Sequence, residues 1–151
     1  MDKQEARAAL AAAQGAADGL AQVSEAACPP WRHAAFGVVM AMMVLAAGMP
    51  LPIYAALFVL AMGGVAALAA WDRRRTGVFV NGFRRGPTLP VSLALLGGML
   101  ALVFAQVHVR ENGLGIVPSL GLAGGAFVLA CGASIVFQRI YLRELRKGLR
   151  P

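Results

Sequence analysis

Residues 71–88 read WDRRRTGVFVNGFRRGPT and lie between two long apolar segments. This stretch contains five of the fourteen Lys and Arg residues of the chain. An arginine at the centre of a membrane helix costs about 2.5–3.5 kcal/mol even on the lenient insertion scale. The five arginines therefore keep this stretch outside the hydrocarbon of a bilayer. We expect it to form a polar loop between two membrane spans.

The composition is that of a membrane protein. Apolar residues make up 59% of the 151 residues, charged residues make up 14%, and the mean hydropathy is +0.68. Soluble domains contain about 45–50% apolar and about 25% charged residues. The first thirty residues mix acidic and basic side chains into an Ala-rich run, and they lack the apolar core of a secretory signal peptide. We therefore expect the first apolar segment to be retained as a membrane helix.

Residues 1–30 are predicted to form a cytoplasmic, Ala-rich helix over about 2–26, followed by an elbow at Pro29 and Pro30. Alanine is the best helix former, whereas proline removes a backbone donor and disfavours helix in the residue before it. A thin apolar stripe along this helix leaves two interpretations open: a loosely docked helix, or a small-residue seam for a second helix. The stripe consists of Leu10, Ala13, Ala17 and Leu20.

Residues 31–138 contain four apolar segments, each close to the roughly 20 residues that a spanning helix needs. Residues 139–151 continue the helical spacing of the last segment with basic side chains and are predicted to project beyond the membrane. The predicted fold class is an all-α membrane protein: a four-helix transmembrane bundle with an N-terminal cytoplasmic helix and a short basic hairpin loop. The predicted spans are about 32–48, 51–71, 90–109 and 117–138.

The basic residues also predict the orientation of the chain. With four spans, both termini and the loop share one side of the membrane. Thirteen of the fourteen Lys and Arg residues then lie on that side, and only Arg110 lies on the other. By the positive-inside rule, we expect a multi-pass protein of the cell inner (cytoplasmic) membrane with both termini in the cytoplasm.

The loop holds the candidate binding residues. Asn81-Gly82 is the pair preferred by a two-residue type I′ turn, so a short β-hairpin is predicted on the cytoplasmic rim. Basic residues near an anionic leaflet contribute roughly 1 kcal/mol each. Two interpretations remain: the arginines only set the topology, or they bind lipid headgroups or another anion. The candidate residues are Arg73, Arg74, Arg75, Arg84 and Arg85.

Glycines fall in the interiors of three spans, where each weakens a water-soluble helix by about 1 kcal/mol relative to alanine. In membranes, small residues allow helices to approach closely. We expect these glycines to form packing surfaces within the bundle, with a contact between two copies of the chain as a second use. The packing glycines are Gly63, Gly64, Gly97, Gly98, Gly121 and Gly125.

Residues that carry chemistry are sparse in the spans. No Asp, Glu, Lys or Arg lies between the span ends, which disfavours ion-coupled transport. The two cysteines should lie at different depths, and His33 and His108 should be interfacial residues at opposite membrane faces, so no disulfide or metal site is expected. Ser134 is expected to bond its own helix backbone, and Cys131 to be a small packing residue. We predict no catalytic residues, no metal, no cofactor, no enzyme activity and no nucleic-acid partner.

The loop also carries a family resemblance, in Arg74-Arg75-Thr76-Gly77-Val78, Val80-Asn81-Gly82 and Arg84. Together with the Ala-rich leading helix and Pro30-Trp31, this pattern, RRTGVxVNGxR, resembles an uncharacterised family of small four-span membrane proteins from high-GC bacteria. The resemblance implies the four-span architecture. It implies no activity and no site residues.

The expected function follows from what the chain offers. We predict a non-catalytic integral inner-membrane protein with a structural, accessory or interaction role. Its predicted partners are the lipid bilayer, anionic lipids, and either a second copy or another membrane protein. One alternative is a small oligomeric channel or transporter, and a second alternative is a regulator that binds anionic lipids.

Overall fold

The computed structural model describes residues 2–26, 29–76 and 86–147, and it contains five helices and no strand in these ranges. The predicted all-α fold is confirmed, whereas the predicted hairpin falls at 77–85, outside the described residues. Four helices are long and apolar enough to cross a membrane. The helices are α1 (Lys3–Ala26), α2 (Pro30–Ala47), α3 (Leu51–Thr76), α4 (Leu89–Glu111) and α5 (Ile116–Lys147).

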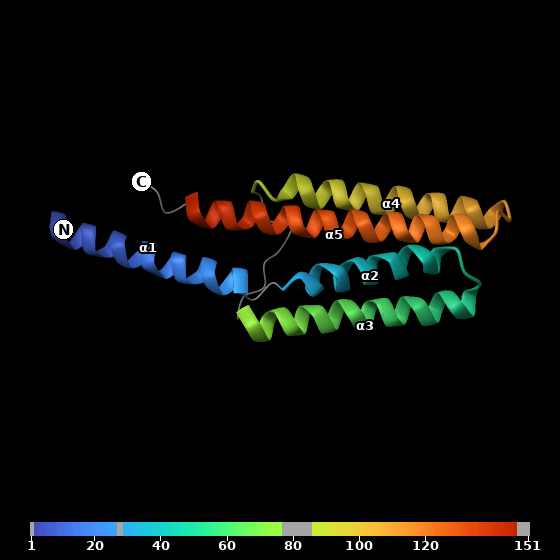
Figure 1. Ribbon diagram of the computed structural model, residues 1–151, viewed down its shortest axis with the longest axis horizontal. Coiled ribbons are helices and arrows are strands. Elements are labelled where there is room, and N and C mark those ends of the chain that lie inside the picture. Colours follow the sequence, from blue (N-terminus) through green and yellow to red (C-terminus); the bar gives the residue numbers. More distant parts are fainter. Residues whose placement is uncertain (1, 27–28, 77–85, 148–151) are drawn as a thin grey trace.

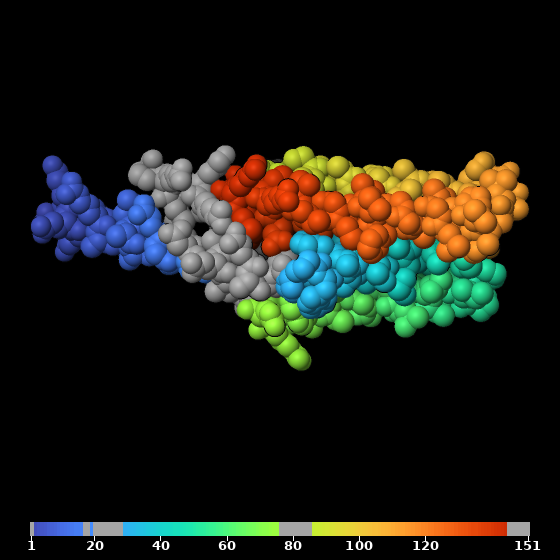
Figure 2. Space-filling view, viewed as in Figure 1, coloured from blue at the N-terminus to red at the C-terminus, as the bar shows by residue number. Residues whose placement is uncertain are grey.

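Helices α2 and α5 form the centre of the bundle (Figure 1). Helix α3 packs on α2, while α4 packs on α5 and, less extensively, on α2. Helix α1 contacts α5 and projects beyond the body formed by the other four helices, as Figures 1 and 2 show. The α2–α3 and α4–α5 links lie together at one end, here called the turn end, and the opposite end is called the basic end (Figure 1).

Two helices run further than the spans predicted for them. Helix α3 continues to Thr76, so Arg73, Arg74 and Arg75 belong to its last turns and not to a loop. Cations are favourable at the C-terminus of a helix because of its dipole, so the three arginines do not end the helix. Helix α4 likewise includes Arg110.

The bundle centre is packed through glycine. A methyl group added at Gly37 of α2 would lie 2.5 Å from Cys131 Sγ and 2.9 Å from Phe127 Cδ2, both on α5. An added methyl at Gly64 would lie 2.7 Å from Val39 Cγ2. At Gly98 it would lie 2.7 Å from Leu129 Cδ2. Each of the three helix contacts therefore contains a site where only hydrogen fits without movement.

The other predicted packing glycines lie outside these contacts. A methyl group added at Gly63, Gly97 or Gly121 would meet nothing within 4 Å in the described structure. At Gly125 it would meet only Leu102 Cδ2, at 3.9 Å, which is ordinary van der Waals contact. Each Gly-Gly pair in α3 and α4 thus places one glycine against a neighbour and the other on the outer surface.

The glycine contacts predict a difference in stability between two alanine variants. Gly37→Ala should lower the unfolding free energy by about 1–3 kcal/mol, because the added methyl overpacks the α2–α5 contact. Gly63→Ala faces open space and should be neutral or stabilise by up to about 1 kcal/mol through helix propensity. Thermal unfolding of the purified variants in one detergent measures the difference. Equal melting temperatures for the two variants would contradict the packing described here.

Candidate functional site: the polar and aromatic contacts of the basic end

An ion pair joins the start of α2 to the end of α3. Arg32 Nε donates to Asp72 Oδ1 at 2.7 Å, and Arg32 Nη2 donates to Asp72 Oδ2 at 2.5 Å. The side chains are 29% and 25% exposed, so the pair is partly shielded from water. Planar two-point contacts of this kind are the stronger form of an arginine–carboxylate bond. The pair therefore closes the α2–α3 hairpin at the basic end.

Two tryptophans lie next to the ion pair. The rings of Trp31 and Trp71 meet edge to face, with centroids 4.9 Å apart and planes at 68°. The Arg75 guanidinium lies over Trp71, 5.0 Å from the ring centroid. Trp31 remains 51% exposed. Tryptophan favours the headgroup layer of a membrane, because its ring is apolar and its indole N–H is polar.

Sequence reasoning missed this cluster, although a signal was present. The dipeptides Trp31-Arg32 and Trp71-Asp72 stand at the two open ends of a predicted helical hairpin. Antiparallel helices joined by a short link bring such ends together. Once the hairpin is assumed, the sequence therefore predicts that Trp31 pairs with Trp71 and that Arg32 pairs with Asp72.

A second polar contact ties α2 to α5. His33 Nδ1 and Ser134 Oγ lie 2.8 Å apart in hydrogen-bond contact, and the Cys131 thiol donates to the His33 carbonyl at 3.2 Å. His33 is 9% exposed and is buried between the helices. The expectation that Ser134 bonds its own helix backbone was wrong, because the Ser134 hydroxyl pairs with His33 of α2.

The predicted anion-binding arginines are only partly placed. Arg73, Arg74 and Arg75 are exposed near the end of α3, whereas Arg84 and Arg85 lie outside the described residues. Arg32 forms an ion pair with Asp72 and so links α2 to α3, instead of adding a separate positive charge to the surface. Within the described ranges, no three His, Cys, Asp or Glu side chains come together in a group that could hold a metal ion.

The serine contact predicts that two serines of α5 differ in their effect on stability. Ser134→Ala removes a bond between helices and should cost about 0.6–1.7 kcal/mol, the range of interhelical hydrogen bonds in membranes. Ser119 is 6% exposed, and its Oγ donates to Gly115 O of the preceding turn at 3.3 Å. Ser119→Ala should therefore change the unfolding free energy little. Chemical unfolding in mixed micelles tests the pair, and an equal loss in both variants would contradict the assignment.

The ion pair predicts non-additive effects in a double-mutant cycle. Arg32→Gln and Asp72→Asn should each lower stability, and the double variant should lose about 1 kcal/mol less than the sum of the single losses. Raising the salt concentration should shrink this coupling, because the pair is partly exposed. If the double variant loses as much unfolding free energy as the two single variants together, the ion pair contributes nothing to the stability of the hairpin.

No family model, no curated protein and no solved structure matches this chain, so no function is taken over from a relative.

Proposed function

We propose that the chain is a non-catalytic integral membrane protein of the inner membrane, and that it assembles with a second copy of itself through the outer face of α5. The observation that carries this proposal is a line of glycines on that face with nothing against them. The proposal extends the predicted second use of the glycines, a contact between two copies of the chain.

The outer face of α5 runs along most of the apolar part of the helix. Its members recur at steps of three and four residues, which places them on one side of an α-helix. A methyl group added at Gly121, Gly124 or Gly132 would meet nothing within 4 Å. The two valines on the face are 77% and 69% exposed. The face consists of Val117, Gly121, Gly124, Val128, Gly132 and Ile135.

This arrangement favours association with another helix over contact with lipid alone. Lipid chains are as apolar as leucine, so helix association in a membrane depends on close van der Waals contact at small residues. Glycine at a position that faces only lipid brings no packing gain and weakens the helix. The line of glycines instead leaves a shallow surface against which a second helix backbone can lie closely.

The basic end supports the proposed membrane orientation. Arg73, Arg74 and Arg75 are exposed at the end of α3, with Arg75 over Trp71, and among the Lys and Arg residues that the structure describes only Arg110 lies at the turn end. Basic residues near an anionic leaflet contribute roughly 1 kcal/mol each. These features favour a cytoplasmic position for the termini. They also favour anionic-lipid binding by Arg73 to Arg75 as a second candidate function.

The channel alternative has less support from the geometry. A pore built by oligomerisation requires polar groups along the shared face. The α5 face carries only Gly, Val and Ile side chains from Val117 to Ile135, and Ser134 points toward His33 of α2. An assembly through this face would therefore bury an apolar contact between helices.

Native mass spectrometry of the full-length protein in mild detergent tests the proposed assembly. The wild-type protein should be a dimer or a higher oligomer, and Gly124→Leu should weaken association roughly tenfold because the side chain holds the helices apart. Gly63→Leu introduces the same side chain at an open position of α3 and should leave association unchanged.

A wild-type protein that stays monomeric in both detergent and bilayer nanodiscs would contradict the proposal. An oligomer that Gly124→Leu leaves intact would also contradict it. Ion flux through vesicles containing the wild-type oligomer would instead support the channel alternative.

A further inference from the structure

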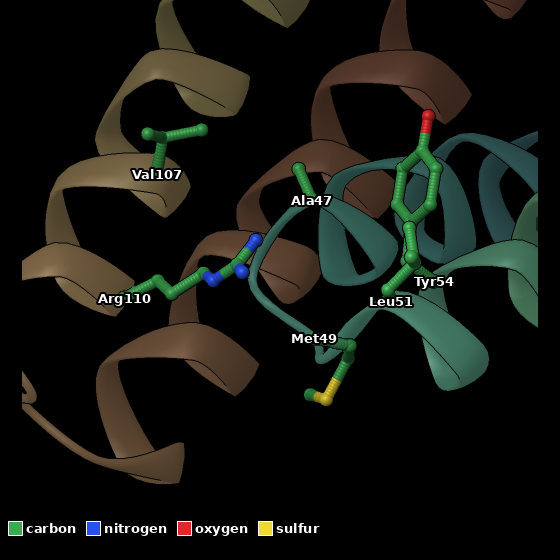
Figure 3. A pocket seen from close by; sticks show the side chains of 6 residues that line it. All are labelled: Ala47, Met49, Leu51, Tyr54, Val107 and Arg110. Carbon is green, nitrogen blue, oxygen red and sulfur yellow. The ribbon is translucent and has the colours of Figure 1, made fainter.

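A pocket opens at the turn end, on the opposite end of the bundle from the arginine-rich segment (Figure 3). Its volume is about 280 Å³. The last residue of α2, the α2–α3 link and the start of α3 form one wall, and the last turns of α4 form the other. The pocket therefore lies between two membrane-length helical hairpins at the level where their apolar parts end. The lining residues are Ala47, Met49, Leu51, Tyr54, Val107 and Arg110.

Arg110 gives the pocket a positive charge. It is the only Lys or Arg between Arg85 and Arg139, and no other lies between Arg32 and Arg73. In Figure 3 its side chain reaches from α4 toward the α2–α3 link. The guanidinium makes no hydrogen bond or ion pair with any described residue. Glu111 is exposed next to it, but adjacent residues on a helix do not face the same direction.

Gln106 supplies an unused polar group directly behind the pocket. It precedes Arg110 by four residues and so lies on the same side of α4, about one turn or roughly 5–6 Å deeper. Gln106 is 0% exposed, and neither its amide nitrogen nor its amide oxygen has a hydrogen-bond partner among the described residues. The amide packs against Gly48, whose two neighbours Ala47 and Met49 line the pocket.

An unpartnered buried amide is costly, by about 1–3 kcal/mol. A leucine of similar size would avoid that cost, so packing alone gives no reason for glutamine at this position. A ligand that enters the pocket and brings its own hydrogen-bonding groups would satisfy the amide, after a small displacement of the 48–50 turn. The pocket, the unpaired cation and the orphan amide therefore point to one ligand.

We propose that this pocket binds a phospholipid, with the lipid phosphate on Arg110 and the glycerol ester groups beside Gln106. A phospholipid carries an anion nearest the water and ester carbonyls deeper along the same molecule, and Arg110 and Gln106 are stacked in that order. The remaining walls are largely apolar, and the Tyr54 ring stacks on Phe58 with centroids 5.8 Å apart. The exposed apolar surfaces of α3 and α4 continue from the pocket along the bundle, where acyl chains can lie.

The test counts the lipids retained by the full-length protein after release from nanodiscs of phosphatidylglycerol and phosphatidylethanolamine, measured by native mass spectrometry. Arg110→Gln should lower retention of phospholipid about tenfold, since it removes the charge-assisted bonds to phosphate. Gln106→Leu should lower retention as well, yet raise the melting temperature of the delipidated protein, because the orphan amide is gone. If Gln106 had only a structural role, its substitution would not lower lipid retention while raising the melting temperature.

Arg139→Gln is the matched control, because Arg139 is exposed on the last turns of α5 at the opposite end, and this variant should leave the lipid bound. Retention unchanged in Arg110→Gln, or unchanged in Gln106→Leu, overturns the proposal. Inorganic phosphate serves as the soluble probe. If it raises the melting temperature of the delipidated wild-type protein as much as phosphatidylglycerol does, the site takes a free anion and the lipid assignment is wrong.

Discussion

The close contact between α2 and α5 is the constraint on which the rest of the bundle depends. Gly37 allows α5 to approach until Cys131 and Phe127 occupy the space that a side chain on α2 would take. Close approach then brings His33 within hydrogen-bond distance of Ser134. In a membrane, water does not drive helices together, so dispersion contact and interhelical hydrogen bonds hold them. Both are present at this crossing, and both require the absence of a side chain at position 37.

The two outer helices are held by separate means. Helix α3 is joined to α2 by the short 48–50 link, by the Gly64–Val39 contact and by the Arg32–Asp72 pair. Helix α4 depends on α5, through the Gly98–Leu129 contact. The figures show α3 and α4 on opposite flanks of the central pair (Figure 1). Two helical hairpins therefore meet along α2 and α5, and their outer helices leave an opening at the turn end.

The number and approximate positions of the helices could be predicted from the sequence, because hydropathy depends only on local composition, whereas the ends of α3 and α4 could not. The contacts between helices could not, because spacing along one helix does not give its rotation relative to another. The Gly63-Gly64 pair illustrates this limit. Adjacent residues point about 100° apart on a helix, so only one of the two can face α2, and the sequence does not say which.

The same limit explains the misassigned polar residues. Ser119 bonds a carbonyl of the preceding turn, as a lone serine in a membrane helix is expected to do, whereas Ser134 bonds across to α2. Nothing within α5 distinguishes them. Their difference arises from His33, which lies on another helix 101 residues earlier in the chain. The burial of Gln106 likewise depends on a residue outside its own helix, because its amide packs against Gly48 after α2.

The two ends of the bundle differ in how well their polar groups are satisfied, and this difference bears on where the protein can change shape. At the basic end, a two-point ion pair and two tryptophan rings in edge-to-face contact hold α2 to α3. At the turn end, the buried Gln106 amide and the Arg110 guanidinium have no hydrogen-bond partner among the residues that the structure describes, which lowers the local free energy of opening. Buried polar groups without a hydrogen-bond partner in the protein tend to occur at functional sites, where a bound ligand supplies the missing bonds. The turn end is therefore the part of the bundle most able to adapt to a bound molecule, while the basic end and the α2–α5 contact keep the helices in place.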